Sequence, residues 1–308
     1  MKDSSHPAAD ASTGDRAGLP YALVTYFIWG LYPLFFKLLE DSPPLEVMTQ
    51  RVIWSLPLCL AILIFRRQFG EYLAVFRDGK ALRILIICSL LIAVNWLMYI
   101  YAVFTGHVLA ASLGYYLNPL VNVLLATLFL GERLSRMQML AVAVASIGVA
   151  TLLAGAIDTL WISLTLATSF AFYGLLRKIV SVGPLSSLAV ETTLLAPPAL
   201  LVSLYYIWVG DGLGFGSDMQ TSWLMIASGA LTALPLLAFA TAARRMRYTT
   251  LGFVQFLAPS LLFLLGLFAF HEPLMPAQLF CFALIWLSIA IFSFDMWKRA
   301  RVVALPVR

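Results

Sequence analysis

Amide and phenol side chains recur at helical spacing inside apolar stretches of this chain, and they are its best candidates for binding a small solute. Asn95 and Tyr99 are four residues apart, and Tyr115, Asn118 and Asn122 follow one another at steps of three and four. Residues at these steps share one face of a helix. Amides supply donors and acceptors, and tyrosine adds an aromatic wall with a polar tip. Together they suit a neutral or zwitterionic solute better than a strongly charged one.

Two more polar faces follow the same spacing. Tyr173 lies one turn after Ser169, and Gln255 shares a face with Pro259. Polar faces are unfavourable against lipid, so we expect them to surround a central cavity. Such side chains also join membrane helices to one another, and the sequence leaves both roles open for each residue. Pro119 and Pro259 predict kinks that are either hinges or static bends.

Three charged residues lie in or beside apolar stretches, where an isolated charge is costly. Arg51 is about 9 Å into its stretch at 1.5 Å per residue, and it is either a snorkelling or a buried functional side chain. Glu191 is similarly deep but enters from the opposite face, so we do not expect the two to pair. It either accepts a fixed hydrogen bond or carries a proton. Lys37 is either an interfacial anchor or a positive group at the outer mouth.

Ten apolar segments must position these residues, and each is long enough to span a bilayer. The chain is 62% hydrophobic and 11% charged, which exceeds what a soluble domain can bury. The segments are unbroken, whereas strands of a membrane barrel alternate over about ten residues. The sequence therefore predicts an all-α integral membrane protein with ten transmembrane helices. The predicted segments are 19–38, 46–65, 82–104, 109–130, 136–154, 158–177, 185–209, 222–243, 249–270 and 276–297.

The basic residues predict the orientation. Of the 20 Lys and Arg residues, all but Lys37 and Arg51 lie in the terminal tails or in and beside the second, fourth, sixth and eighth gaps. Lys and Arg concentrate on the cytoplasmic side of membrane proteins. We therefore predict a multi-pass protein of the inner (cytoplasmic) membrane with both termini in the cytoplasm. Residues 1–18 are predicted to form a disordered tail, and residues 298–308 a basic tail.

The two halves of the chain look duplicated, as 19–154 and 158–297. Shifts of 140 or 141 residues align prolines and a lysine between them. The aligned residues are Lys37 and Lys178, Pro43 and Pro184, Pro57 and Pro198, and Pro119 and Pro259. Because each half has five segments, the second half enters the membrane from the opposite side. Inverted repeats are typical of secondary transporters, whose substrate site lies near the midplane between the repeats.

Five segments of the chain also carry a family resemblance. They are WGLYPLFFK (29–37), EVMTQRVIWSLP (46–57), NWLMYIYAVFTGHVLAASLGYYLNPLVNVLLATLFLGERL (95–134), SFAFYGLLRK (169–178) and LPLLAFATAARRMRYTTLGFVQFLAPSLLFLLGLFAFHEP (234–273). They resemble the RarD group of chloramphenicol-sensitivity proteins, within the EamA-type drug/metabolite transporter superfamily. The resemblance covers nearly all of residues 19–297 and implies ten helices in two inverted repeats and transport of small molecules. Gln50 stands where it implies a histidine, which argues against proton coupling at that position.

We therefore expect secondary transport of small organic solutes or drugs by alternating access, with the lipid bilayer and a small-molecule substrate as partners. A channel or structural membrane protein is the alternative, and a membrane-embedded enzyme is the third reading. No nucleic acid, cofactor or metal is expected, because the three cysteines are isolated and a phosphate-binding loop motif is missing. Glu132 and Glu272 follow equivalent segments and are expected to cap the next helix or to pair with a nearby base. Substrate, direction, coupling ion and oligomeric state stay open.

Overall fold

The computed structural model describes residues 7–130, 135–155, 157–209, 214–245 and 254–304 of the chain. Within these ranges the fold is helical and has no β-strand, which confirms the predicted all-α class. The helices are α1 (Pro7–Lys37), α2 (Pro44–Phe65), α3 (Phe69–Val75), α4 (Gly79–Phe104), α5 (Val108–Leu130), α6 (Arg136–Gly155), α7 (Ile157–Ile179), α8 (Pro184–Val209), α9 (Met219–Arg245), α11 (Leu257–Phe268) and α12 (Pro276–Ala304).

Local sequence explains where two of the helices begin. Pro44 opens α2 after the extended residue Pro43 (φ −58°, ψ 135°). Proline suits the first helical turn, because the N–H that it lacks would have no partner there. Asp78 caps α4, since its Oδ1 accepts hydrogen bonds from the amides of Lys80 (3.0 Å) and Ala81 (3.1 Å). Each helix therefore starts at a residue that leaves few backbone donors unsatisfied.

The helices extend beyond the predicted segments at both ends of the chain. α1 starts at Pro7, so residues 7–18 are helical where the sequence predicts a disordered tail. A proline at the first position followed by several alanines favours this helix. α12 likewise continues to Ala304, past the predicted end at residue 297.

The short helix α3 has no counterpart among the predicted segments. Its residues Tyr72 and Val75 are buried. The Tyr72 hydroxyl lies 3.0 Å from the Thr193 hydroxyl of α8. α3 therefore folds back against the bundle because a few apolar residues in a charged gap find a buried surface there.

Seven helical segments within the described ranges are long and apolar enough to cross a membrane. They are Ala17–Lys37, Pro44–Phe65, Gly79–Phe104, Ile157–Arg177, Pro184–Tyr206, Met219–Phe239 and Pro276–Asp295. Two shorter apolar helices, Arg136–Leu152 and Leu257–Phe268, accompany them. The chain is therefore a multi-pass helical membrane protein.

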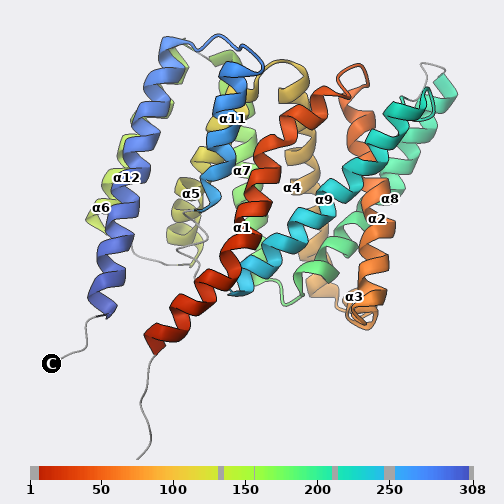
Figure 1. The fold of residues 1–308 in the computed structure, drawn as a ribbon, viewed down its shortest axis with the longest axis horizontal. Helices are drawn as coiled ribbons and strands as arrows, with labels where there is room; N and C mark the ends of the chain where they lie inside the picture. Colours follow the sequence, from red (N-terminus) through yellow and green to blue (C-terminus); the bar gives the residue numbers. More distant parts are fainter. Residues whose placement is uncertain (1–6, 131–134, 156, 210–213, 246–253, 305–308) are drawn as a thin grey trace, which may run out of the picture.

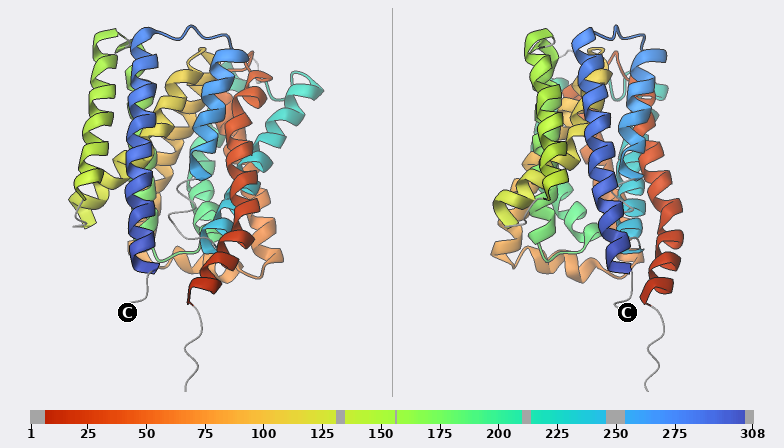
Figure 2. Two further views of the ribbon diagram at one scale, coloured as in Figure 1. Left: turned by 60° about the vertical axis from the view of Figure 1, so that its left-hand side comes forward. Right: turned by 90° about the vertical axis from the view of Figure 1, so that its left-hand side faces the viewer.

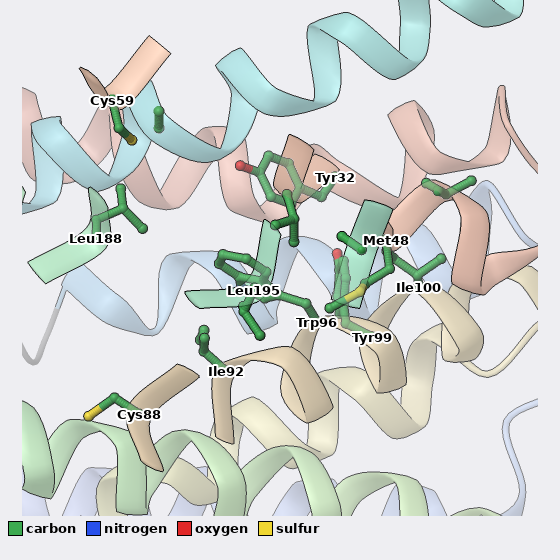
Figure 3. Packing of buried hydrophobic residues seen from close by; sticks show 14 of the residues in the cluster. Tyr32, Met48, Cys59, Cys88, Ile92, Trp96, Tyr99, Ile100, Leu188 and Leu195 are labelled. Atoms are coloured by element: carbon green, nitrogen blue, oxygen red, sulfur yellow. The ribbon is translucent and has the colours of Figure 1, made fainter. Parts of the chain in front are cut away.

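The helices pack side by side in one bundle (Figures 1 and 2). α6 lies against α12 at one side, and α2 lies against α8 and α9 at the other (Figure 1). Between them, α1 packs on α9 and α11, and α7 packs on α4 and α5. The largest buried cluster lies where α1, α2, α4 and α8 meet, around Tyr32, Met48, Trp96 and Leu195 (Figure 3). Segments from both halves of the chain therefore build the core together.

One end of the bundle carries exposed basic side chains. α3 and the described ends of α1 and α12 lie at this end (Figure 1). The Glu71 carboxylate of α3 accepts a hydrogen bond from the Gly183 amide (2.9 Å), which ties the α2–α4 connection to the α7–α8 connection. Arg245 at the end of α9 lies over the Tyr21 ring at 5.1 Å. The second, sixth and eighth gaps, which the sequence marks as basic, therefore lie at one end.

α2 and α9 cross with their backbones in close contact. A methyl group built on Gly229 of α9 would lie 2.5 Å from the carbonyl carbon of Trp54 in α2. Small residues at such crossings let membrane helices approach closely. The Ser55 hydroxyl also donates to the Gly229 carbonyl oxygen at 3.3 Å. Even one added carbon therefore has no room at this crossing.

Gly229→Ala should lower the melting temperature of the purified protein, because overpacking a tight contact costs about 1–3 kcal/mol. Gly174→Ala in α7 is the matched control, since a methyl group there meets no atom within 4 Å. Alanine favours a helix more than glycine does, so this control should be neutral or stabilising. Thermal unfolding in detergent measures both variants. Equal melting temperatures for the two would contradict the close crossing.

Candidate functional site

Asn95 lies at the centre of the bundle and joins three helices. Its Nδ2 donates to the Leu166 carbonyl oxygen (3.1 Å) and to the Ser169 hydroxyl (3.0 Å), both in α7. Its Oδ1 accepts a hydrogen bond from the Tyr115 hydroxyl of α5 at 3.2 Å. With 1% of its surface exposed, this amide is engaged in bonds between helices in the observed conformation.

Tyr99 and Tyr115 form part of an aromatic row beside Asn95. Their ring centroids are 5.8 Å apart, and the Phe36 ring of α1 lies 6.1 Å from Tyr99. Phe170 of α7 lies edge-on to Tyr115 at 6.2 Å. The Tyr99 hydroxyl is buried and has no hydrogen-bond partner among the described residues. A buried hydroxyl without a partner is unfavourable, so this position suits a ligand group.

Asn118 lies one turn after Tyr115 on α5, as the sequence spacing predicts. It is 1% exposed, and its Oδ1 has no hydrogen-bond partner within the described part of the chain. The side chains of Pro119 and Asn122 lie outside the described residues, so the predicted kink and the last member of this face stay predictions. Asn95 and Asn118 are thus equally buried, but they differ in how fully their polar atoms are bonded.

Gln255 and Pro259 lie at α11. Gln255 is half-buried immediately before the helix, and Pro259 is buried within it. The Pro259 carbonyl oxygen accepts a hydrogen bond from the Ser112 hydroxyl of α5 at 2.8 Å. This bond links α5 to α11, whose sequences align in the two halves. Whether Pro259 bends or hinges the helix stays a prediction.

Arg51 is buried, with 4% of its surface exposed, so its side chain stays within the bundle instead of reaching the interface. Its Nε donates to the Thr232 hydroxyl of α9 at 2.5 Å. Its guanidinium carbon lies 4.3 Å from the Trp96 ring centroid and 5.7 Å from that of Tyr32. Its Nη1 is buried and has no partner among the described residues. Aromatic faces attract the cation, but they do not accept a hydrogen bond from Nη1.

Glu191 of α8 takes part in a different network. Its carboxylate accepts hydrogen bonds from Arg177 Nη1 (3.3 Å) and from the Tyr173 hydroxyl (3.1 Å), both in α7. Glu191 therefore does not pair with Arg51, which agrees with the prediction from the sequence that the two residues are not partners. Tyr173 lies in this network as a donor to a buried carboxylate. A role of Glu191 as a proton carrier stays a prediction.

Lys37 ends α1, and its side chain is exposed. Its Nζ lies 4.9 Å from the centroid of the Phe270 ring, which precedes the α11–α12 connection. This cation–π contact at a helix end fits an interfacial anchor. It does not bring Lys37 into the buried cluster.

The comparisons with known proteins agree with this arrangement. The EamA-like transporter family matches residues 16–154, which is close to the first predicted repeat. A Pseudomonas aeruginosa protein named an uncharacterized transporter is 43% identical over 300 residues, covering 96% of this chain and 99% of that protein. The chain belongs to the EamA-like transporter family. Protein RarD of Escherichia coli is 41% identical over 281 residues, and the match covers 91% of this EamA-like chain and 95% of that protein. The resemblance to the RarD group is therefore confirmed.

One solved crystal structure is similar in fold to this EamA-like chain. The TM-score is 0.57, and the match covers 89% of this chain and 96% of that chain at 18% identity. At this identity the similarity shows the fold alone.

Two carboxylates of the EamA-like chain accept hydrogen bonds from backbone amides of distant segments, Glu272 at another helix than the one predicted and Glu46 without any prediction from the sequence. Glu272 accepts hydrogen bonds from the amides of Val108 (2.5 Å) and Leu109 (3.0 Å), so it caps α5 and not the helix that follows it. Burial raises the pKa of the Glu272 carboxyl, and the two amides act in the opposite direction. Glu46, which is fully buried, accepts a hydrogen bond from the Phe215 amide at 3.0 Å. Its position in the first turn of α2, where acidic residues are favoured, is the one sequence signal that could have found it.

An apolar groove lies apart from the buried polar residues. Its volume is about 440 Å³, and Tyr116, Phe256, Ser260, Phe263 and Trp286 are among its lining residues. It lies where α5 meets α11 and α12. By contrast, Asn95, Asn118 and Tyr99 are enclosed, so a solute reaches them only when helices of this EamA-like chain move apart.

Proposed function

We propose that this protein is a secondary transporter, without enzyme activity, that moves small organic solutes across the inner membrane by alternating access. The observation that carries the proposal is the buried polar and aromatic cluster, which we define as Arg51, Asn95, Tyr99, Tyr115 and Asn118. Ionisable side chains buried inside a membrane protein often mark substrate or ion pathways, and Arg51 Nη1, the Tyr99 hydroxyl and Asn118 Oδ1 have no hydrogen-bond partner among the described residues. The relatives named transporters support the same reading.

The proposed architecture is ten transmembrane helices in two inverted repeats, 19–154 and 158–297. If α1, α2, α4, α5 and α6 correspond to α7, α8, α9, α11 and α12, then each strong contact between the halves should have a symmetric counterpart. The α1–α9 contact corresponds to α7–α4, α1–α11 to α7–α5, and α2–α9 to α8–α4, and all six pairs are in contact. This symmetry supports the repeat. Five helices per half make the second copy antiparallel to the first, as in many secondary transporters.

We further propose that the basic end of the bundle faces the cytoplasm, with both termini on that side. Single cysteines at Lys80 and Arg245, placed in a cysteine-free background, should be protected from an impermeant thiol reagent in intact cells. Cysteines at Asp158 and Asp218 should be labelled. All four side chains are exposed, so burial does not decide the result. Labelling of the first pair and protection of the second would reverse the orientation.

An uptake screen tests the proposed function while the substrate is still unidentified. Proteoliposomes containing the purified protein are incubated with a mixture of small metabolites, and mass spectrometry identifies the solutes inside. We expect protein-dependent accumulation of a few organic solutes in the absence of ATP. Uptake equal to that of protein-free liposomes for every solute would contradict the proposal.

A further inference from the structure

The charge and surroundings of Arg51 narrow the class of solute. We infer that the cluster binds an organic monocarboxylate, whose carboxylate pairs with Arg51 while its apolar or aromatic body packs on the neighbouring rings. The inference rests on the proposed function, because it assigns the substrate class of the same cluster. It departs from the sequence-based expectation of a neutral or zwitterionic solute.

The first step concerns the missing counter-charge. Arg51 forms no ion pair within 4.0 Å with a carboxylate of the residues that the structure describes, whereas Arg177 pairs with Glu191. Arg51 therefore lacks a carboxylate partner among these residues, although it is buried with only 4% of its surface exposed. A buried charge without a partner is strongly unfavourable, and the contact with Trp96 compensates it only in part. An anion bound beside Arg51 would complete the pair.

The second step concerns hydrogen-bond donors. Arg51 Nη1 and the Tyr99 hydroxyl are both buried without a partner among the described residues. The Phe36 ring contacts both the Arg51 guanidinium and the Tyr99 ring, so the two groups lie beside the same aromatic side chain. A carboxylate accepts several hydrogen bonds, and those from a guanidinium are among the strongest in proteins. An amide or ester of the same shape would leave the charge of Arg51 uncompensated.

The third step concerns the solute body. Trp96 and Tyr99 of α4 point toward Tyr32 of α1 and Met48 of α2 (Figure 3). The Phe36 ring lies 5.8 Å from the guanidinium carbon and 6.1 Å from Tyr99. Aromatic walls with few polar groups suit an apolar or aromatic body.

The fourth step concerns the number of charges. Arg177, which is 20% exposed, is already bonded to Glu191 in a separate network. One free cation neutralises one negative charge, so a dianion such as a phosphate monoester would bring an uncompensated charge into the bundle. The cluster therefore favours a monocarboxylate over a phosphate.

Binding of 3-phenylpropionate to the purified protein in nanodiscs tests the inference. Its neutral amide, 3-phenylpropionamide, and phenyl phosphate serve as comparison probes. Each probe is titrated into the protein, and the rise in melting temperature reports its affinity. The acid should bind at least tenfold more tightly than either comparison probe. Equal affinity for acid and amide would overturn the inference, and tighter binding of phenyl phosphate would overturn the assignment to a monocarboxylate.

Variants place the carboxylate in the cluster. Arg51→Gln should abolish the preference for acid over amide, whereas Arg245→Gln at the basic end should keep it. Tyr99→Phe is a second test of the site in case Arg51→Gln does not fold. It should fold normally, because the hydroxyl that it removes has no partner in the described part of the structure. It should keep the ligand-free melting temperature and weaken acid binding several-fold. Full acid preference in both Arg51→Gln and Tyr99→Phe would overturn the site.

Failure of this inference can be told apart from failure of the proposed function. If the protein accumulates neutral solutes in the uptake screen but shows no preference for the acid, the inference is wrong and the transport proposal stands. If the acid binds through Arg51 but no solute is accumulated, the binding site stands and the transport proposal is wrong.

Discussion

Asn118→Ala should lower transport about tenfold, which corresponds to the loss of about 1.4 kcal/mol of solute binding, while leaving the melting temperature close to that of the unmodified protein. The Asn118 Oδ1 is buried without a partner among the described residues. Its removal therefore breaks no observed hydrogen bond to that oxygen, and the lost interaction is the one with the solute. Uptake by proteoliposomes and thermal unfolding in detergent measure the two effects separately.

Asn95→Ala is the matched comparison, because both asparagines are 1% exposed. Asn95 makes three hydrogen bonds to α5 and α7, and such bonds contribute about 0.6–1.7 kcal/mol each in a membrane protein. The melting temperature should therefore fall for Asn95→Ala and not for Asn118→Ala. Full transport by Asn118→Ala at normal abundance would remove Asn118 from the solute path.

Arg177→Ala should cause a large loss of stability. It leaves the Glu191 carboxylate, which is 1% exposed, without its ion-pair partner. Breaking a buried ion pair costs about 3–5 kcal/mol, and the 20% exposure of Arg177 places the expected cost near the lower end. Membrane abundance and the melting temperature should both fall.

The double variant Arg177→Ala with Glu191→Gln is the control for this prediction. Glutamine removes the unpaired charge while keeping an acceptor for the Tyr173 hydroxyl, so most of the lost stability should return. A double variant that is no more stable than Arg177→Ala would show that the Arg177 side chain stabilises the bundle by packing and not through the charge of Glu191.

The sequence predicts the helices well, because apolar length and charged gaps are local properties. The predicted segments 46–65, 82–104 and 158–177 lie within α2, α4 and α7. The start of α1 at Pro7 was missed, because a polar, alanine-rich segment reads as a tail when it carries no apolar face. α3 was missed for a related reason, since its stability comes from packing on α8 and not from its own seven residues.

The candidate site could be predicted only in part. Helical spacing identifies Asn95, Tyr99, Tyr115 and Asn118, and the structure places all four within the bundle, with Tyr115 the least buried of them. Spacing does not distinguish Asn95 from Asn118, because the partners of Asn95 in α7 lie more than 70 residues away in sequence. The same limit hides the capping of α5 by Glu272, which is 163 and 164 residues from the amides whose hydrogen bonds it accepts.

The unpartnered Nη1 group of Arg51 is a further property that sequence cannot give. A charged residue about six positions into an apolar segment is compatible with snorkelling. The choice between interface and interior depends on Trp96 and Tyr32, which come from two other helices. Distant partners therefore decide which of the predicted polar residues are available to a solute.

Counterflow in proteoliposomes tests the central claim, transport by alternating access at the cluster, most directly. Liposomes are loaded with an unlabelled solute found in the uptake screen, and a trace of labelled solute is added outside. We predict that labelled solute accumulates transiently above its equilibrium level without ATP, because a carrier exchanges one molecule for another. Asn118→Ala should reduce this overshoot while the protein stays folded. Simple equilibration without overshoot would indicate a channel, and an unchanged overshoot in Asn118→Ala would contradict transport through this cluster.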